Sequence, residues 1–240
     1  MDEKELKTSP KQRFFIILIA VLMLGSIIAS YAAIVLNGSK SSGESGDSKI
    51  DEAKVAEYEE AYNAATKKFQ EKTKADFEEL KSHRDVVVAY NETAANSGGV
   101  QSKDIVEGTG REIGEGDKDY LAYYVGWCAD GTVFDSSFDD YDNPTGLKSV
   151  LDLSANSLIE GWYAAMVGAK VGGIRRITIS GELAYGDSME ICGGYNKPIR
   201  FLVMTRENGG ELKELSSELE TAFMRYQYAQ YGIDYDSVGE

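Results

Sequence analysis

The stretch LIEGWYAAMVGAKVGGIRRITISGELAYG, residues 158–186, contains a helical pattern followed by a strand pattern. Its first part, residues 158–166, has the spacing of a helix of little more than two turns, and Gly168 follows where such a helix would end. The cluster SANS at residues 154–157 precedes it and is typical of an N-cap. Residues 174–179, IRRITI, are rich in β-branched side chains. The stretch therefore predicts a short capped helix followed by a strand.

Further strands are predicted on both sides of this stretch. They are residues 86–88, 101–106, 120–128, 147–153 and 199–205. In the last of them, Ile199, Phe201 and Val203 lie on one face. Strands that neighbour each other in sequence are joined by turns, and only one short helix lies between them. The pattern predicts an α+β fold in which an antiparallel sheet wraps around one short helix, without βαβ repeats.

Amphipathic helices are predicted on both sides of this domain. Residues 50–84 contain no Gly or Pro, and apolar side chains recur along them every three or four positions, with a slip in register after Phe69. After the break at Gly209-Gly210, residues 211–231 return to helical spacing. The two helices could pack on each other or on the sheet, or they could form an oligomer with a second copy as a coiled-coil stalk.

The amino-terminal region contains an uncharged apolar run, residues 14–36. As a helix it would be about 35 Å long, against a hydrocarbon core of about 30 Å. Four basic residues precede the run and two follow it in the linker. This asymmetry predicts a single-pass signal anchor in the cell membrane, with a cytoplasmic amino terminus and an extracytoplasmic domain. Cleavage at Ser30-Tyr31-Ala32, as in a secretory signal, stays an alternative, as does a buried helix of a soluble protein.

The sequence thus predicts six consecutive segments. They are a cytoplasmic segment (1–13), a transmembrane anchor (14–36), a Gly/Ser linker (37–49), an amphipathic helix (50–84), the sheet domain (85–207), and a carboxyl-terminal helix and tail (208–240).

Composition excludes several classes of function. The net charge of −15 repels phosphate backbones, so no nucleic-acid partner is expected. A single His removes most metal sites and the His-dependent nucleophiles, so we expect no metal and no cofactor. The acidic run at residues 138–143 could suggest calcium, but it lacks the ligand order of a calcium loop. A solvated loop is the expectation there.

Short motifs occur in a fixed order along the sheet domain. They are Tyr124-x-Gly126, Asp130-Gly131, Phe134-Asp135-Ser136-Ser137, Ile159-x-Gly161-Trp162, Met166 with Gly168, Gly172, and Ala184-Tyr185-Gly186. In this order they resemble the FKBP-type peptidyl-prolyl cis/trans isomerases, over residues 99–207. The resemblance implies an FKBP-like fold and an isomerase for proline-containing polypeptides, which would assist the folding of extracytoplasmic proteins. A non-catalytic binding or scaffold module with the same fold stays the alternative.

The resemblance also implies a proline pocket with named residues. Trp162 would form the floor, and the Tyr185 hydroxyl and the Ile159 N–H would bind substrate carbonyls. Asp135 would orient the polar edge of the site. The implied walls are Tyr124, Phe134, Leu158, Ile159 and Phe201. Taken from the residues alone, the same aromatic side chains could be ordinary core, and Asp135 could cap a turn.

Two departures from the family pattern concern the pocket. Ser149 stands where the family often supplies another aromatic wall, which could widen the pocket. The rim loop, residues 187–198, reads DSMEICGGYNKP and has Gly193-Gly194-Tyr195 in place of two prolines. We therefore expect activity to be reduced relative to typical members.

The two cysteines could meet at this rim. Cys128 lies four residues after Tyr124 on the same predicted strand, so the two share a face, and Cys192 belongs to the rim loop expected above that face. In an oxidising compartment this placement predicts a Cys128–Cys192 disulfide. Two unrelated small apolar residues are the alternative.

Overall fold

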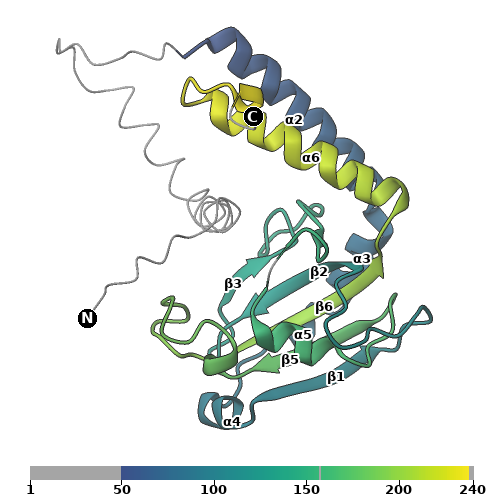
Figure 1. Ribbon diagram of the computed structural model, residues 1–240, viewed down its shortest axis with the longest axis vertical. Helices are drawn as coiled ribbons and strands as arrows, with labels where there is room; N and C mark the ends of the chain where they lie inside the picture. The colour runs from purple at the N-terminus through teal and green to yellow at the C-terminus, as the bar shows by residue number, and fades with distance from the viewer. Residues whose placement is uncertain (1–49, 157, 238–240) are drawn as a thin grey trace, which may run out of the picture. The chain divides into compact units, whose positions relative to one another are not determined.

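The computed structural model describes residues 50–156 and 158–237 (Figure 1). The predicted segments 1–13, 14–36 and 37–49 lie outside these residues. Within the described ranges, no helix is long and apolar enough to cross a bilayer.

A six-stranded antiparallel sheet forms the centre of the domain, in the order β1-β5-β6-β2-β3, with β4 also paired to β2 (Figure 1). The strands are β1 Val100–Val106, β2 Tyr120–Trp127, β3 Val133–Ser136, β4 Leu151–Asp152, β5 Ile174–Ile179 and β6 Ile199–Glu207. The predicted α+β class is confirmed, and β1, β2, β5 and β6 begin within one residue of their predicted starts.

The helices flank or cross this sheet. They are α2 Glu52–Lys72, α3 Lys74–Ser82, α4 Glu92–Ser97, α5 Glu160–Met166 and α6 Gly210–Ala229, with short 3-10 turns η1 Arg84–Val86, η2 Gly181–Leu183 and η3 Tyr235–Ser237. The helix predicted over residues 50–84 is divided at Thr73, where the sequence showed a slip in register. The Thr73 hydroxyl donates to the Phe69 carbonyl at 2.8 Å, so this residue is buried at the break without an unpaired polar group.

Two further sequence predictions are wrong. Residues 86–88 form no strand: Val87 N–H bonds to the Arg84 carbonyl in a tight turn, and the Val88 carbonyl accepts from the Trp127 indole. The SANS cluster does not cap α5, because the N-cap is Ile159 and makes no side-chain cap bond. Ser154 and Asn156 bond instead to Asp152, two to four residues back, and so close a local turn.

The strand predicted over residues 147–153 is reduced to the two residues of β4. Leu147 makes only an isolated bridge to Phe138, and Val150 packs into the core without a strand partner. These apolar residues are therefore buried without being paired in a strand. The periodicity of a sequence does not distinguish a buried loop from a paired strand.

Each face of the sheet carries its own apolar core. The α5-side core includes Tyr120, Ala122, Trp162, Ile177, Phe201 and Val203. The α3-side core includes Phe77, Leu80, Leu121, Tyr123, Trp127 and Leu202, together with residues of α2 and α6. Successive residues of β2 thus alternate between two cores, and both faces of this central strand are covered.

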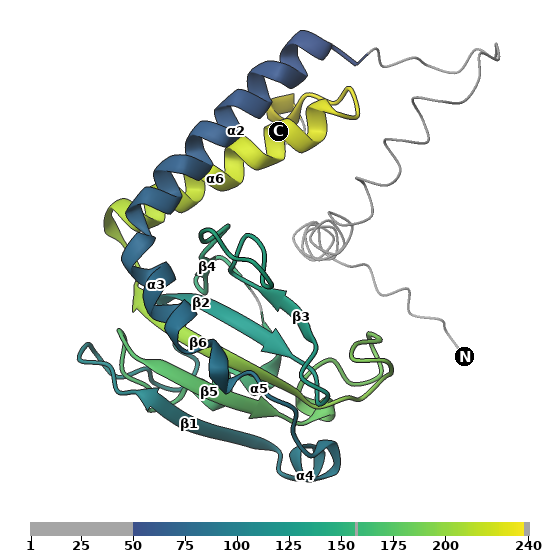
Figure 2. The same ribbon diagram turned by 180° about the vertical axis from the view of Figure 1, so that it is seen from behind.

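The flanking helices pack on each other and on the sheet, two of the packing modes left open by the sequence. Helices α2 and α6 lie side by side (Figure 1, Figure 2), with the Tyr62 ring stacked on Tyr226 at 6.0 Å. The pair is antiparallel, because Lys54 near the start of α2 bonds Asp234, beyond the end of α6, at 2.9 Å. Helix α3 is tied to β6 by Arg206, which bonds Asp76 and Glu79.

Candidate active site

Four aromatic rings from four elements meet on the α5 side of the sheet. Phe201 of β6 lies at the centre, with ring centroids 5.1 Å from Trp162 of α5, 6.1 Å from Tyr124 of β2 and 5.7 Å from Phe134 of β3. All of these pairs are edge-to-face, the arrangement that the ring quadrupoles favour. Gly126 makes this possible, because a Cβ there would lie 2.7 Å from the rings of Phe134 and Phe201. The structure brings together four predicted pocket residues.

The orientation of Trp162 is fixed at both ends of its side chain. Its indole Nε1 donates to the Tyr120 hydroxyl at 3.2 Å, and its ring edge packs against Tyr124 and Phe201. Burial raises the pKa of Tyr120 to about 12, so this hydroxyl stays neutral at physiological pH. A ring held in this way is a rigid apolar group, with its one polar atom already bonded.

Asp135 accepts hydrogen bonds from two directions. The Tyr124 hydroxyl donates to Oδ2, and the backbone N–H of Ser136 donates to Oδ1 at 2.8 Å. Burial, followed by the charge of Asp135, raises the pKa of Tyr124 well above its usual value, so Tyr124 acts only as a donor. Lys148 lies 3.8 Å from Oδ1. The Asp135 carboxylate thus joins the Tyr124 side chain to the backbone at Ser136, and its role in the site stays a prediction.

Two polar groups beside the rings have no partner within the described part of the chain. The Tyr185 hydroxyl and the backbone N–H of Ile159 make no hydrogen bond to any described residue. Burial, and secondarily the charge of Asp135, raises the pKa of Tyr185 to about 12, so its hydroxyl stays protonated. Leu158, next to Ile159, is partly buried in the same core and donates its own N–H to the Tyr163 hydroxyl at 3.0 Å. The two free donors are available to an incoming ligand.

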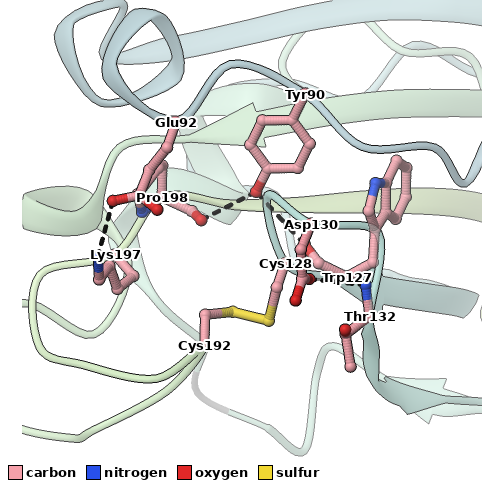
Figure 3. The surroundings of a disulfide bond; sticks show 9 residues. All are labelled: Tyr90, Glu92, Trp127, Cys128, Asp130, Thr132, Cys192, Lys197 and Pro198. Carbon is pink, nitrogen blue, oxygen red and sulfur yellow. Dashed lines mark hydrogen bonds and ion pairs between the residues drawn. A yellow bond between two sulfur atoms is a disulfide. The ribbon is translucent and has the colours of Figure 1, made fainter.

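The disulfide predicted from the sequence is present. Cys128, directly after β2, is bonded to Cys192 of the rim loop, with their Cα atoms 5.4 Å apart (Figure 3). The bond ties the rim loop to the end of the strand that carries Tyr124. The prediction from strand periodicity is therefore confirmed.

Several residues at the site were not predicted. Met189 and Ile191 of the rim loop pack into the α5-side core, and Ile191 is only 6% exposed. Ser149 is exposed and Val150 belongs to the α3-side core, so the rim loop supplies apolar wall that residues 149 and 150 do not. Tyr120 could have been found, since it lies four residues before Tyr124 on the same face of a predicted strand.

Known proteins are similar to this chain over its sheet domain. A family profile described as FKBP-type peptidyl-prolyl cis-trans isomerase matches residues 110–205. An FK506-binding protein of Neisseria meningitidis serogroup B is 38% identical over 89 residues, which are 37% of this chain and 76% of that protein. Human peptidyl-prolyl cis-trans isomerase FKBP4 is 41% identical over 83 residues, 34% of this chain and 17% of that protein. The crystal structure of AtFKBP13 is similar at 26% identity and a TM-score of 0.35, covering 48% of this chain and 96% of that one.

A similarity of this extent defines a prolyl isomerase, an enzyme that interconverts the cis and trans forms of the bond before proline. The chain belongs to the FKBP-type peptidyl-prolyl cis-trans isomerase family, and its substrates are proline-containing polypeptides. The family expected from the sequence motifs is confirmed, and the enzyme is favoured over the non-catalytic module.

Proposed function

We propose that the ring cluster is the proline pocket of this isomerase. The peptide bond before proline rotates over a barrier of about 18–20 kcal/mol, because amide resonance holds it planar. No nucleophile is needed to lower this barrier. A dry apolar surface that grips the proline ring and favours the twisted amide over the planar one is sufficient. Trp162, with its indole N–H already bonded to Tyr120, would be the floor under the proline ring.

The polar groups of the pocket would hold the substrate backbone. The free hydroxyl of Tyr185 and the free N–H of Ile159 would donate to carbonyl oxygens on the substrate. Asp135 would act through Tyr124, whose hydroxyl it binds, and so keep that ring edge-on to Trp162. Phe134, Leu158 and Phe201 would complete the apolar wall, a list that follows the residues predicted from the sequence.

We propose further that the enzyme works outside the cytoplasm, tethered to the cell membrane through residues 14–36, where it assists the folding of extracytoplasmic proteins. The Cys128–Cys192 disulfide supports this proposal, because such bonds persist in oxidising compartments and are rare in the cytosol. The basic residues that precede the apolar run support the same orientation. Self-association through the flanking helices would have to use their outer faces, since the apolar faces of α2 and α6 meet within one chain.

Protease treatment of intact cells tests this location. With a tag at each end of the full chain, an external protease should remove the carboxyl-terminal tag and leave a short protected amino-terminal fragment. A known surface protein and a known cytoplasmic protein serve as the two controls. Survival of the full-length chain while the surface protein is digested would contradict the proposed topology.

A further inference from the structure

The rim loop, residues 187–198, closes one side of the proposed proline pocket. Met189 and Ile191 pack into the same core as Trp162 and Phe201. The loop is therefore part of the wall that would enclose a substrate in that pocket. The contacts that hold the loop in place therefore bear on how the enzyme binds its substrate.

Inside the loop, the tightest turn places a cysteine in a backbone conformation that side chains rarely adopt. Ile191 and Gly194 exchange both of their backbone hydrogen bonds, at 2.9 and 3.1 Å, around Cys192 and Gly193, whose φ values are 56° and 75°. Two consecutive positive φ angles are those of a type I′ turn, and only the glycine adopts one without strain. Such a turn needs support from outside the loop, and the disulfide to Cys128 gives part of it.

The rest of the support comes from residues 88–96, which we call the bracing segment. It precedes residues 110–205, the part of the chain that matches the family profile. The Tyr90 hydroxyl donates to the Pro198 carbonyl at 2.9 Å, at the carboxyl-terminal end of the rim loop (Figure 3). Asn96 accepts from the Gly181 N–H at 2.8 Å, shortly before the loop begins. The bracing segment thus holds the chain on both sides of the loop.

The bracing segment also contacts the strand end that carries the other half of the disulfide. The Tyr90 N–H donates to the Ala129 carbonyl at 2.8 Å, and the Val88 carbonyl accepts from the Trp127 indole at 3.0 Å. The Arg200 guanidinium lies 4.0 Å from the centre of the Tyr90 ring, which fixes the ring under the loop. Tyr90 therefore joins the end of β2 to the end of the rim loop.

The contacts of the bracing segment differ in how much they stabilise the position of the loop. The Glu92–Lys197 ion pair, at 2.8 Å, has side chains that are 47% and 31% exposed, so solvent screens it and it contributes little (Figure 3). The Tyr90 hydroxyl is partly buried, and the Pro198 carbonyl that it satisfies is buried as well. Losing this bond would leave a buried carbonyl unpaired, which costs more than losing an exposed ion pair. Tyr90 is the residue to test.

We propose that Tyr90 is a positioning residue of the isomerase, which sets the enclosure of the substrate side chain before proline by holding the rim loop against the pocket. This inference rests on the proposed pocket roles of Trp162 and its neighbours. Tyr90 contacts no substrate in this scheme, and acts through Pro198 and the loop.

The test compares Tyr90→Phe with Tyr228→Phe, a matched change in α6, where the Tyr228 ring lies 5.4 Å from the ring of Tyr235 in the tail. Isomerase kinetics are measured on peptides with Leu or Ala before proline. For the Leu peptide, Tyr90→Phe should raise KM about two- to tenfold, the range of one lost hydrogen bond, while kcat changes by less than about twofold. The Ala peptide should change little. Tyr228→Phe should leave both peptides at wild-type values.

Amide hydrogen exchange gives a second measurement that does not depend on turnover. Two amides report on the loop: the Ile191 N–H bonds to the Gly194 carbonyl at 2.9 Å, and the Asn196 N–H bonds to the Gly186 carbonyl, just before the loop, at 2.7 Å. In Tyr90→Phe both amides should exchange faster than in the wild type. A fall in thermal stability with unchanged KM values and unchanged exchange in the loop would overturn the proposal, because Tyr90 would then be structural only. A wild-type chain inactive on every peptide would contradict the pocket roles instead, and the exchange rates alone would then decide whether Tyr90 holds the loop.

Discussion

The two tryptophans of this chain lie on opposite faces of the same sheet. Trp162 belongs to the α5-side core and Trp127 to the α3-side core, and they are 2% and 0% exposed. Each donates its indole N–H to an internal oxygen, that of Tyr120 for one and of Val88 for the other. By burial and hydrogen bonding the two side chains are nearly equivalent.

What differs is the surroundings of each ring. Beside Trp162 lie two hydrogen-bond donors with no partner in the described chain, the Tyr185 hydroxyl and the Ile159 N–H, and a loop held by a disulfide. Over the α3-side core lies a helix, whose charged residues Asp76 and Glu79 are paired with Arg206 of the sheet. The Tyr123 hydroxyl of the α3-side core also lacks a hydrogen-bond partner among the described residues, but it is fully buried there. The α5 side is therefore distinguished by unpartnered donors that lie beside a loop wall, and not by its aromatic content or by unpartnered donors alone.

Replacing each tryptophan by Ala should give the largest difference between the two faces: one replacement should mainly lower stability, and the other should mainly lower activity. Trp127→Ala should lower the free energy of unfolding by about 3–5 kcal/mol, the cost of a large buried aromatic. The folded fraction should keep wild-type kcat, with KM raised no more than in Tyr90→Phe, because the Val88 carbonyl of the bracing segment loses its bond to the indole. Trp162→Ala should abolish measurable proline binding, because it removes the platform under the proline ring. Denaturant unfolding followed by circular dichroism, with a peptide isomerase assay on the folded protein, separates the two effects.

Trp162→Leu serves as the control for unfolding, since it keeps part of the apolar volume and should still lose most of the activity. The distinction between the faces would be wrong if folded Trp127→Ala lost as much activity as Trp162→Ala.

Opening the disulfide should have the next largest effect. Its cysteines are 64 residues apart, and replacing both by Ala should destabilise the protein by about 2–4 kcal/mol. Guanidinium unfolding with and without reductant measures the loss. Alkylation without reductant, followed by mass spectrometry, should find no labelled thiol. Two labelled thiols would show that the disulfide is absent. An unfolding midpoint that is the same with and without reductant would show the same.

Local periodicity was sufficient for some elements and insufficient for others. Strand β5 has its predicted bounds because the branched residues of 174–179 favour strands wherever they pair. Strand β3 was not predicted, since its four residues become a strand only through pairing with Val125 and Gly126 of β2. Helix α4 has six residues and depends on the Asn91 cap and contacts with β5. Such short elements form only through contacts with residues that are distant in sequence. The local periodicity of the sequence carries no information about those contacts.

The site was predictable to a similar degree. The positions of Tyr124, Phe134, Trp162 and Phe201 followed from the family resemblance, and the structure brings them together, while their roles in catalysis stay a prediction. The bracing segment could not be predicted from the sequence, because Tyr90 bonds to Pro198 and no local pattern indicates a pair so distant in sequence.

The smallest expected effect concerns the unpartnered Tyr185 hydroxyl on the α5 face. Tyr185→Phe keeps the ring and removes one hydrogen bond, so kcat/KM should fall by about tenfold or less, with the circular dichroism spectrum unchanged. A loss as large as that of Trp162→Ala would mean that Tyr185 supports the fold of the pocket rather than the substrate.

The pH dependence of that donor follows from its pKa. A tyrosine of ordinary pKa, about 10, would be half ionised at pH 10 and would lose half of its donor function there. Because burial raises the pKa of Tyr185 to about 12, the hydroxyl stays protonated, and its contribution is lost only as the pH rises toward that value. The ratio of wild-type to Tyr185→Phe activity should therefore stay constant from pH 6 to about 10. If the ratio instead fell by about half on reaching pH 10, the hydroxyl would be ionising as an exposed tyrosine does. That outcome would show Tyr185 open to water, and the α5 face would then lack the protonated donor proposed to bind a substrate carbonyl.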